Sequence, residues 1–287
     1  MSTTATTAPR TAPLAPRRRR RLKPGWLVLN SNVVLTFLFL YAPILILVIF
    51  SFNASRQQAV WVGFTIEWYG QMMRDERVIA AAKNSLIIAL VSTAVSTVIG
   101  TLTALALDRF RFRAKTAFEG AMYLPIIVPE IVMAISLLVF FNTTFTLLDR
   151  WLGLTLKFGL GTITIAHIAF SFPFVAVVVR ARLADFDRTL EQAAQDLGAN
   201  EWQTFRYVTL PLLMPGILAG ALLAFTLSID DFVITFFNAG IGATTLPLEI
   251  YGRIRRGITP EVNALSAVLL LASIALVLGS VLLQRRR

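Results

Sequence analysis

Long apolar runs separated by shorter polar segments dominate the hydrophobic pattern of the chain. The runs cover residues 27–52, 84–107, 120–141, 160–180, 213–237 and 262–283. The polar segments between them are 53–83, 108–119, 142–159, 181–212 and 238–261. A helix that crosses a lipid bilayer needs about 20 mostly apolar residues, and each run is long enough. The pattern therefore predicts an all-α polytopic membrane protein with six transmembrane helices.

The composition agrees with this prediction. Hydrophobic residues make up 56% of the 287 residues and charged residues only 15%, whereas soluble globular proteins carry about 25% charged residues. The chain has no cysteine, which excludes disulfides, thiolate metal sites and cysteine nucleophiles.

The N-terminal residues 1–26 are rich in Ser, Thr, Ala and Pro and contain the basic run Arg17–Arg21. Because such a segment has too little apolar surface to fold, we expect a disordered tail. A run of arginines can bind nucleic acid. Directly before a membrane span, the run is better explained as a cytoplasmic anchor that is attracted to anionic membrane lipid. We therefore expect no nucleic-acid partner. The apolar run that follows is too long for a signal peptide, whose core has about 7–15 residues.

The distribution of positive charge predicts the orientation. With the tail placed in the cytoplasm, the segments on the cytoplasmic side, together with Arg180 at the end of the fourth run, carry 18 lysines and arginines, against 9 on the outer side. Cytoplasmic segments of membrane proteins carry such an excess. We therefore expect both termini, including the basic end 285–287, and the polar segment 181–212 to lie in the cytoplasm, with residues 27–284 forming the transmembrane domain.

The polar segment 181–212 begins with the features of a short helix. Apolar residues recur at helical spacing from Leu190 to Leu197, and Asp185 or Asp187 can cap the helix N-terminus. Gly198 is expected to end the helix in a left-handed conformation. An ordinary surface loop is the alternative interpretation of this segment.

A second short helix is expected to follow. Asn200 is a favourable N-cap, and the helix is expected to end where Pro211 and Pro215 turn the chain back towards the membrane. We call residues 181–212, which hold both predicted helices, the coupling segment.

The coupling segment resembles a known motif. Ala193-Ala194, Gly198 and, after nine intervening residues, Val208-Thr209-Leu210-Pro211 are similar to the EAA loop of ABC-importer permeases, E-A-A-x3-G-x9-I-x-L-P. The register places Gln192 where that family usually has glutamate, with Glu191 just before it. In the family this loop is the coupling helix that docks into a groove on the cytoplasmic ATPase. The resemblance implies docking by Glu191, Gln192, Ala193, Ala194, Asp196, Leu197, Gly198, Leu210 and Pro211.

Ionisable side chains interrupt the apolar runs at Glu130, His167 and the pair Asp230–Asp231. A charge at the bilayer centre costs about 2.5–3.5 kcal/mol on insertion scales, so such residues usually face a cavity, a partner or water. Acids along a passage attract cations, which makes Glu130, Asp230 and Asp231 candidate substrate-pathway residues. The alternative is a structural hydrogen bond between helices. Counted along the runs, Glu130 is expected near the membrane midplane and the Asp pair nearer the outer face. His167 is expected to be a core histidine.

Small residues recur every fourth position in the fifth run, at Gly216, Gly220 and Ala224. This spacing is typical of close contacts between membrane helices.

A second resemblance extends over most of the chain. The stretches Ser228–Ile234, Gly242–Pro247 and Pro260–Leu265 are similar to the spermidine/putrescine type of permease subunit. This implies a type I ABC-importer permease of MetI-like architecture in the bacterial inner membrane. It also implies a second permease subunit, expected to form a heterodimer with this chain, a cytoplasmic ABC ATPase dimer and an extracytoplasmic substrate-binding protein. Permeases for other small organic cations or amino-acid-like solutes share much of this pattern.

Other function classes lack their sequence features. The chain has no G-x-x-x-x-G-K-[ST] motif, so we expect that it binds no cofactor and that a partner ATPase uses the ATP. An intramembrane hydrolase would need a nucleophile motif such as G-x-S-x-G, which is absent. A secondary transporter, the main alternative, usually shows internal repeats, and none is visible. We therefore expect a transport subunit without catalytic or metal-binding residues, not an enzyme.

Overall fold

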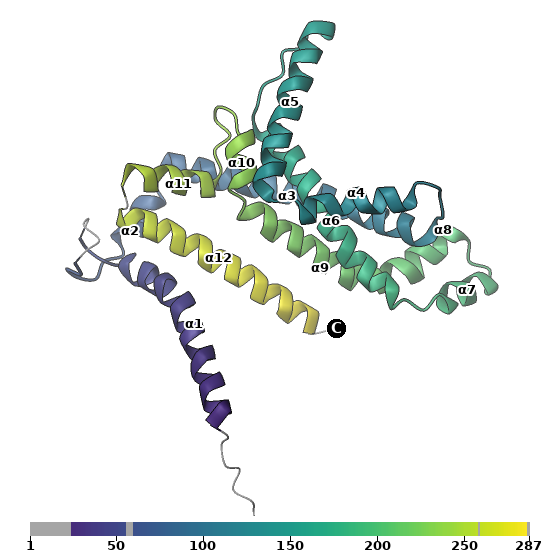
Figure 1. Cartoon of the computed structure of the whole chain (residues 1–287), viewed down its shortest axis with the longest axis horizontal. Helices are drawn as coiled ribbons and strands as arrows, with labels where there is room; N and C mark the ends of the chain where they lie inside the picture. The colour runs from purple at the N-terminus through teal and green to yellow at the C-terminus, as the bar shows by residue number, and fades with distance from the viewer. Residues whose placement is uncertain (1–23, 56–59, 258, 286–287) are drawn as a thin grey trace, which may run out of the picture. The chain divides into compact units, whose positions relative to one another are not determined.

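A computed structural model describes residues 24–55, 60–257 and 259–285 of the chain. In these residues the only β pairing is an isolated bridge between Asn53 and Phe64, so the predicted all-α class is confirmed. The elements (Figure 1) are α1 (Pro24–Phe50), α2 (Glu67–Met72), α3 (Glu76–Arg109), α4 (Lys115–Ile127), α5 (Glu130–Leu152), α6 (Leu160–Ala184), α7 (Thr189–Asp196), α8 (Glu201–Thr204), the π-helical segment η1 (Phe205–Thr209), α9 (Leu210–Ile229), α10 (Val233–Asn238), α11 (Leu246–Arg256) and α12 (Pro260–Arg285).

The described residues fall into two compact units, one before Leu47 and one from Leu47 onwards. In the described residues, the first unit consists of the part of α1 before Leu47, and the second holds all the other elements. Residues 1–23 of the predicted tail and residues 286–287 of the basic end lie outside the described part. The helix α1 begins at Pro24 and therefore includes the last three residues, 24–26, of the predicted tail.

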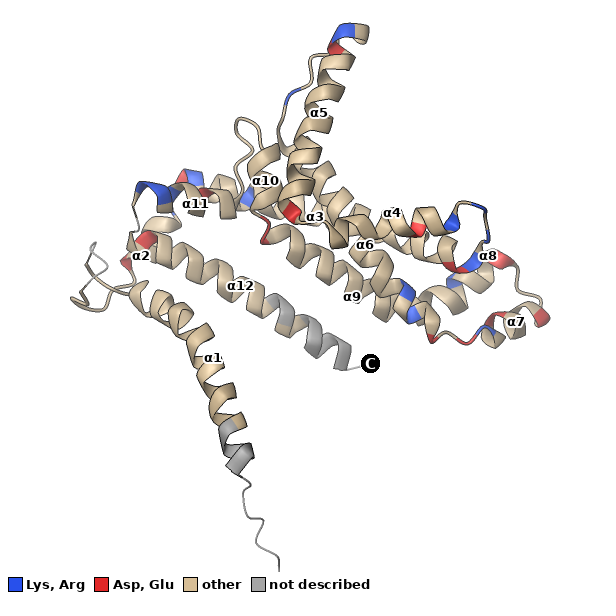
Figure 2. Cartoon of the chain, in the orientation of Figure 1, with Lys and Arg blue, Asp and Glu red and all other residues tan. Residues whose placement is uncertain are grey.

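Helices of membrane-spanning length recur along the described part of the chain. Five described stretches are long and apolar enough to cross a membrane, and α12 adds a shorter apolar stretch, Pro260–Ala275. The five are Leu29–Phe50, Glu76–Arg109, Glu130–Leu152, Leu160–Ala184 and Glu201–Ile229. Figure 2 shows the middles of these helices almost free of charge, with Lys, Arg, Asp and Glu gathered at helix ends and connections.

The third predicted span is wrong in its position. We expected one helix over 120–141, but the chain breaks between α4 and α5 at Val128–Pro129. Val128 has an extended conformation (φ −71°, ψ 135°), as residues before proline usually do, and proline itself supplies no N–H for the helix. The helix long enough to span the membrane is therefore α5, which begins at Glu130.

The fifth predicted span, 213–237, differs at both ends. The helix is continuous from Glu201 through η1 into α9, so the prediction that Pro211 ends it is wrong. In the π segment before Pro211 the hydrogen-bond register is already shifted, since the Leu210 N–H bonds to Phe205 O. A helix with such a shifted register can accommodate a proline, which has no N–H to donate. At the other end α9 stops at Ile229, and α10 begins at Val233.

The helices α3, α6 and α9 pack against one another and form the centre of the second unit. Small residues allow this close approach: a Cβ added to Gly100 of α3 would lie 2.7 Å from Val175 Cβ, and one on Gly220 of α9 would lie 3.0 Å from Val175 Cγ1. Val175 of α6 is therefore held between two glycines. The predicted contact face of the fifth run is confirmed, since Gly216, Gly220 and Ala224 are all buried.

Candidate functional site

The two chain breaks bring the predicted acids into one cavity. Glu130 is the first residue of α5, directly after one break, and Asp230 and Asp231 lie in the other break, between α9 and α10. A cavity of about 350 Å³ is lined by Glu130, Phe170, Thr226, Leu227, Asp230, Asp231, Phe232 and Val233. Both breaks therefore face the same cavity, and the expectation about the depths of Glu130 and the Asp pair in the membrane stays a prediction. We call this space the acidic cavity.

Asp231 is the most buried of the three acids, with 6% of its surface exposed. Its Oδ1 accepts the N–H of Ile234 at 3.2 Å, and its Oδ2 accepts the N–H and the hydroxyl of Thr235, each at 2.8 Å. A carboxylate that accepts the first free N–H groups of a helix stabilises its N-terminus. Asp231 therefore fixes the start of α10.

His167, in the middle of α6, contacts Asp231 from the other side. Its Nε2 lies 3.0 Å from Asp231 Oδ2, and its Nδ1 lies 2.7 Å from Ser228 Oγ. The Ser228 hydroxyl is also hydrogen-bonded to the hydroxyl of Ser92 on α3, at 3.0 Å. With the imidazole proton on Nε2, His167 donates to Asp231 and accepts from Ser228, so both ring nitrogens are satisfied. The expectation of a core histidine is confirmed, and its contacts join α3, α6, α9 and α10.

Glu130 and Asp230 are the less constrained acids. Asp230 is exposed, and its Oδ1 accepts the hydroxyl of Ser273 at 3.1 Å. Glu130 is half-buried, and its carboxyl group interacts with that of Asp231. Asp231, by contrast, already uses both carboxylate oxygens within the protein. Glu130 and Asp230 are therefore the two acids best placed to contact a molecule in the acidic cavity.

Aromatic rings complete the cavity wall. Phe170 and Phe232 line it, and the Phe232 ring centre lies 4.7 Å from that of Tyr251 on α11 and 5.5 Å from that of Phe236 on α10. The face of an aromatic ring attracts cations within about 6 Å of its centre. The cavity thus combines carboxylates with apolar, polarisable surface.

In the coupling segment, the predicted first helix, glycine break and second N-cap are all present. Gly198 adopts φ +92°, and Asn200 caps α8 by accepting the N–H of Gln203 at 2.9 Å. Asp187, rather than Asp185, caps the first helix, because its Oδ1 accepts the N–H of Thr189 at 2.9 Å. This backbone hydrogen bond, together with one from the Thr189 side chain, lowers the pKa of Asp187 below its ordinary value.

The predicted docking residues do not all face the same way. Gln192, Ala193, Asp196, Leu197, Gly198 and Pro211 are exposed, and Ala194 and Leu210 are half-buried. Leu197 is 90% exposed, and the apolar Trp202 and Tyr207 nearby are 64% and 72% exposed. Glu191 instead contacts its own chain, accepting hydrogen bonds from Arg109 and Thr209.

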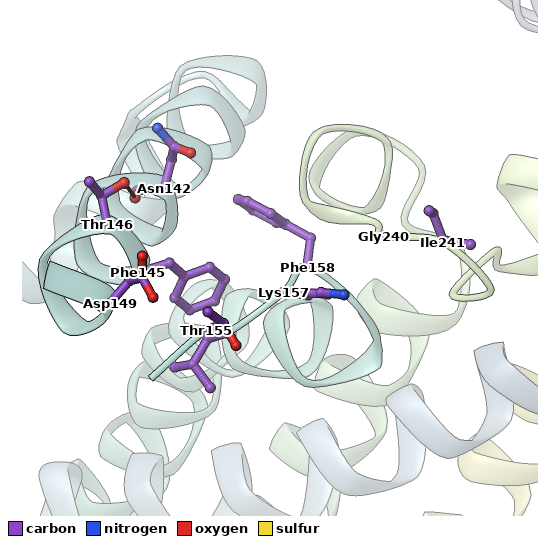
Figure 3. Close-up of a pocket in the computed structure, with 10 residues that line it drawn as sticks. Asn142, Phe145, Thr146, Asp149, Thr155, Lys157, Phe158, Gly240 and Ile241 are labelled. Carbon is purple, nitrogen blue, oxygen red and sulfur yellow. Dashed lines mark hydrogen bonds between the residues drawn. The ribbon is translucent and has the colours of Figure 1, made fainter. Parts of the chain in front are cut away.

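A second cavity, of about 540 Å³, lies between the end of α5, the following loop and the loop after α10 (Figure 3). Its wall includes Asp149 and Lys157, and the protruding Ile241 marks its edge. Gly240 makes this arrangement possible, because an added Cβ would lie 1.8 Å from the carbonyl oxygen of Phe158. No sequence pattern indicates this cavity, because its wall combines segments that are distant along the chain.

Arg253, in the last predicted outer segment, is surrounded by three carboxylates. Arg253 of α11 donates to Asp75 Oδ2 at 2.6 Å and to Glu249 Oε1 at 2.9 Å, and lies 3.6 Å from Glu261 at the start of α12. Burial raises the pKa of Asp75, but the hydrogen bond from Arg253 and those from the N–H groups of the first α3 turn outweigh it, so the pKa is lowered overall. Arg253 therefore ties α11 to the starts of α3 and α12.

Metal binding finds no support in the part of the chain that the structure describes, where no group of three or more His, Asp or Glu side chains is arranged to hold an ion.

Comparisons with known proteins agree with this architecture. The model of the family "Binding-protein-dependent transport system inner membrane component" matches residues 96–286. The putrescine transport system permease protein PotI of Escherichia coli (strain K12) is 43% identical over 239 residues, which cover 83% of this chain and 84% of that protein. The spermidine/putrescine transport system permease protein PotC of the same strain is 42% identical over 261 residues, or 91% and 95% of the two chains.

Solved structures show the same fold. A bacterial ABC transporter involved in the import of the acidic polysaccharide alginate matches with a TM-score of 0.76 and 19% identity over 92% of this chain and 96% of that chain. The MetNI methionine ABC transporter in an inward-facing conformation matches with a TM-score of 0.57 and 18% identity over 78% and 99%. The fold is therefore that of a multi-pass ABC-importer permease, and the chain belongs to the family of inner-membrane components of binding-protein-dependent transport systems.

Proposed function

We propose that this chain is the permease subunit of an ATP-binding-cassette importer and that its substrate is a polyamine such as putrescine or spermidine. The acidic cavity carries the proposal: Glu130 and Asp230 face a space that Phe170 and Phe232 also line. The relative at 43% identity is named for putrescine transport and the relative at 42% identity for spermidine/putrescine transport. Both names support the same substrate class.

The chemistry of the cavity suits a polyamine. Such a molecule has ammonium groups separated by flexible methylene chains. Carboxylates hold ammonium groups through charge-assisted hydrogen bonds, and aromatic rings accept either methylene groups or the cation itself. A transport pathway must also release its substrate, so each contact has to be weak enough to break. Two accessible acids and two aromatic rings provide several such contacts.

The partners follow from the same assignment. The chain binds no cofactor and is not an enzyme; ATP is hydrolysed by a separate cytoplasmic ABC ATPase dimer that docks on the coupling segment. A second permease subunit completes the pathway as a heterodimer, and an extracytoplasmic binding protein delivers the substrate. The family description "binding-protein-dependent" supports the last partner, and one structural neighbour was solved with its periplasmic protein bound. The chain lies in the bacterial inner membrane with both termini in the cytoplasm.

In this role the permease is a passive gate. ATP closes the ATPase dimer, the coupling segment moves with it, and the spans change from inward-facing to outward-facing. Energy enters only through the partner, and Glu130, Asp230 and the aromatic rings provide the path that the substrate follows.

The test is uptake by the complete complex in proteoliposomes, with the ATPase, the second permease and the binding protein. We expect ATP-dependent uptake of labelled putrescine or spermidine. The other polyamine, added unlabelled, should compete with this uptake, and a neutral amino acid should not. A complex that hydrolyses ATP and imports another solute, but neither polyamine, would overturn the substrate assignment. Uptake that needs an ion gradient and no ATP would overturn the importer assignment itself.

A further inference from the structure

Glu191 points into its own protein from the helix that is proposed to meet the ATPase. It lies in the first turn of α7, its side chain is only 17% exposed, and it accepts hydrogen bonds from Arg109 Nη2 and from the hydroxyl of Thr209. Arg109 is 82 residues away and is the last residue of α3. Thr209 is fully buried and is the last residue of η1.

A second ion pair joins the same two elements. Arg188, directly before α7, donates to Asp108 on α3 at 2.7 Å, with the two side chains 61% and 26% exposed. Exposed ion pairs contribute little to stability because water competes for both partners. Glu191 is more buried and has two donors, so it is expected to carry most of the connection between α7 and α3.

The two contacts of Glu191 lead directly into the central helices. The C-terminal part of α3 packs through Ala104 and Leu105 into the same buried cluster as Leu213 of α9. Phe205 of η1 packs against that cluster. A displacement of α7 that keeps both hydrogen bonds must therefore move the end of α3 and the start of the helix that continues into α9. The π register at η1 is a place where a helix can shift its hydrogen bonds, and Thr209 lies there.

We propose that Glu191 is a positioning residue that transmits the motion of the coupling segment to α3 and α9, and that it is not a docking residue. The neighbouring Gln192 is exposed and lies about 100° further round the helix, so it is available to the ATPase. This inference rests on the proposed function, because it needs an ATPase that moves α7. It assigns the two adjacent residues of the motif different tasks.

The experiment compares ATPase retention with the efficiency of transport in the full complex. Variants are Glu191→Gln, which removes the charge and keeps the shape, and Thr209→Val, which removes one donor. Gln192→Ala tests the docking face, and Gln195→Ala is a matched control on the exposed surface of the same helix. The readouts are the amount of ATPase that copurifies and the number of substrate molecules imported per ATP hydrolysed.

We expect Glu191→Gln to keep the ATPase at wild-type stoichiometry and to lower import per ATP about tenfold, as expected for the loss of a charge-assisted contact. Thr209→Val is expected to lower the same ratio less. Exchanging the pair, Arg109→Glu with Glu191→Arg, is expected to restore much of the ratio because the charges again attract. Gln192→Ala is expected to weaken ATPase retention and leave the ratio unchanged, and Gln195→Ala to behave as wild type.

Two results would overturn the inference. One is a Glu191→Gln complex that loses its ATPase but imports normally per ATP when excess ATPase is added, since this is the behaviour of a docking residue. The other is a wild-type ratio in both Glu191→Gln and Thr209→Val. Should Glu191→Gln fail to assemble, import per ATP hydrolysed is measured for Thr209→Val and for the exchanged pair instead. A wild-type value for Thr209→Val would then overturn the inference. Failure of wild-type complexes to import polyamines would overturn the substrate assignment only, because the ratio can be measured with any imported substrate.

Discussion

His167 Nε2 lies 3.0 Å from Asp231 Oδ2, although the two residues are 64 positions apart and both side chains are almost completely buried. This contact joins the middle of α6 to the non-helical break that follows α9. Because Asp231 also caps α10, the pair fixes the course of the chain through the break. The neighbours of Asp231 on either side, Asp230 and Phe232, both line the acidic cavity, so their positions depend on this buried contact.

Replacing His167 with Phe is expected to lower stability and uptake together. The ring keeps its approximate size, but Asp231 and Ser228 each lose a buried hydrogen-bond partner, which typically costs about 1–3 kcal/mol. Thermal unfolding of the purified protein in detergent measures the first effect, and uptake the second. Thr164→Val is the control, since the Thr164 hydroxyl on the same helix only bonds to the carbonyl one turn before it. An unchanged unfolding temperature for His167→Phe would contradict the structural role of the contact.

Neutralising the two adjacent aspartates is expected to give different defects. Both carboxylate oxygens of Asp231 accept hydrogen bonds from N–H or hydroxyl groups. In Asp231→Asn one of these oxygens becomes an amide NH2, which cannot accept, so the unfolding temperature should fall. Asp230→Asn keeps an oxygen for the Ser273 hydroxyl and should fold normally. Its loss of charge should slow polyamine uptake about ten- to a hundredfold, as for a lost charge-assisted contact. Wild-type uptake by Asp230→Asn would show that this acid is not a substrate contact.

How much of this site the sequence could predict depends on how local each feature is. Gly198 and Asn200 were predicted correctly because a left-handed glycine and an N-cap depend only on their nearest neighbours in the chain. The break at Pro129 had a local signal in the proline itself, but the apolar run 120–141 continues through it. The break at Asp230 has no proline or glycine; it forms because Asp231 finds its partners on α6 and α10.

The side-chain partners of the coupling segment show the same limit. The motif points to the segment, but nothing in the residues around Glu191 indicates that Arg109, 82 positions earlier, takes up its charge. Packing of α3 against α6 and α9 brings the two together. Contacts of this kind depend on the whole fold, so a local pattern could assign the segment but not the direction of each side chain.

Gly100→Ala is expected to disrupt the central packing. The new methyl group would lie 2.7 Å from Val175 Cβ and 2.8 Å from the carbonyl oxygen of Phe172, and overpacking of this kind typically costs about 1–3 kcal/mol. Gly120→Ala is the matched control, because nothing lies within 4 Å of its added Cβ. Unfolding temperatures and the yield of assembled complex measure the effect. Equal values for the two variants would contradict the close approach of α3 and α6.

The contact between Asp75 and Arg253 is expected to make stability depend on pH. The pKa of Asp75 is lowered in the folded protein, so its contribution is present above the ordinary aspartate pKa and is lost as the pH falls through the lowered folded-state value. Asp75→Asn should therefore unfold at a lower temperature than wild type at pH 6. The difference should shrink as the pH falls below the ordinary aspartate value, about 4. A difference that stays constant over this range would contradict the charge-dependent contact.

Cysteine labelling can test the membrane orientation because the chain contains no cysteine of its own. Leu197 and Ile241 are both highly exposed, and the charge distribution predicts that the first faces the cytoplasm and the second the outside. In cells with a permeabilised outer membrane, a membrane-impermeant maleimide should label Ile241→Cys at once. It should label Leu197→Cys only after the inner membrane is opened. Arg111→Cys, in the other predicted cytoplasmic loop, is the control and should follow Leu197→Cys. Labelling of Leu197→Cys in sealed cells would place the coupling segment outside, where no ATPase could reach it, and would invert the proposed topology.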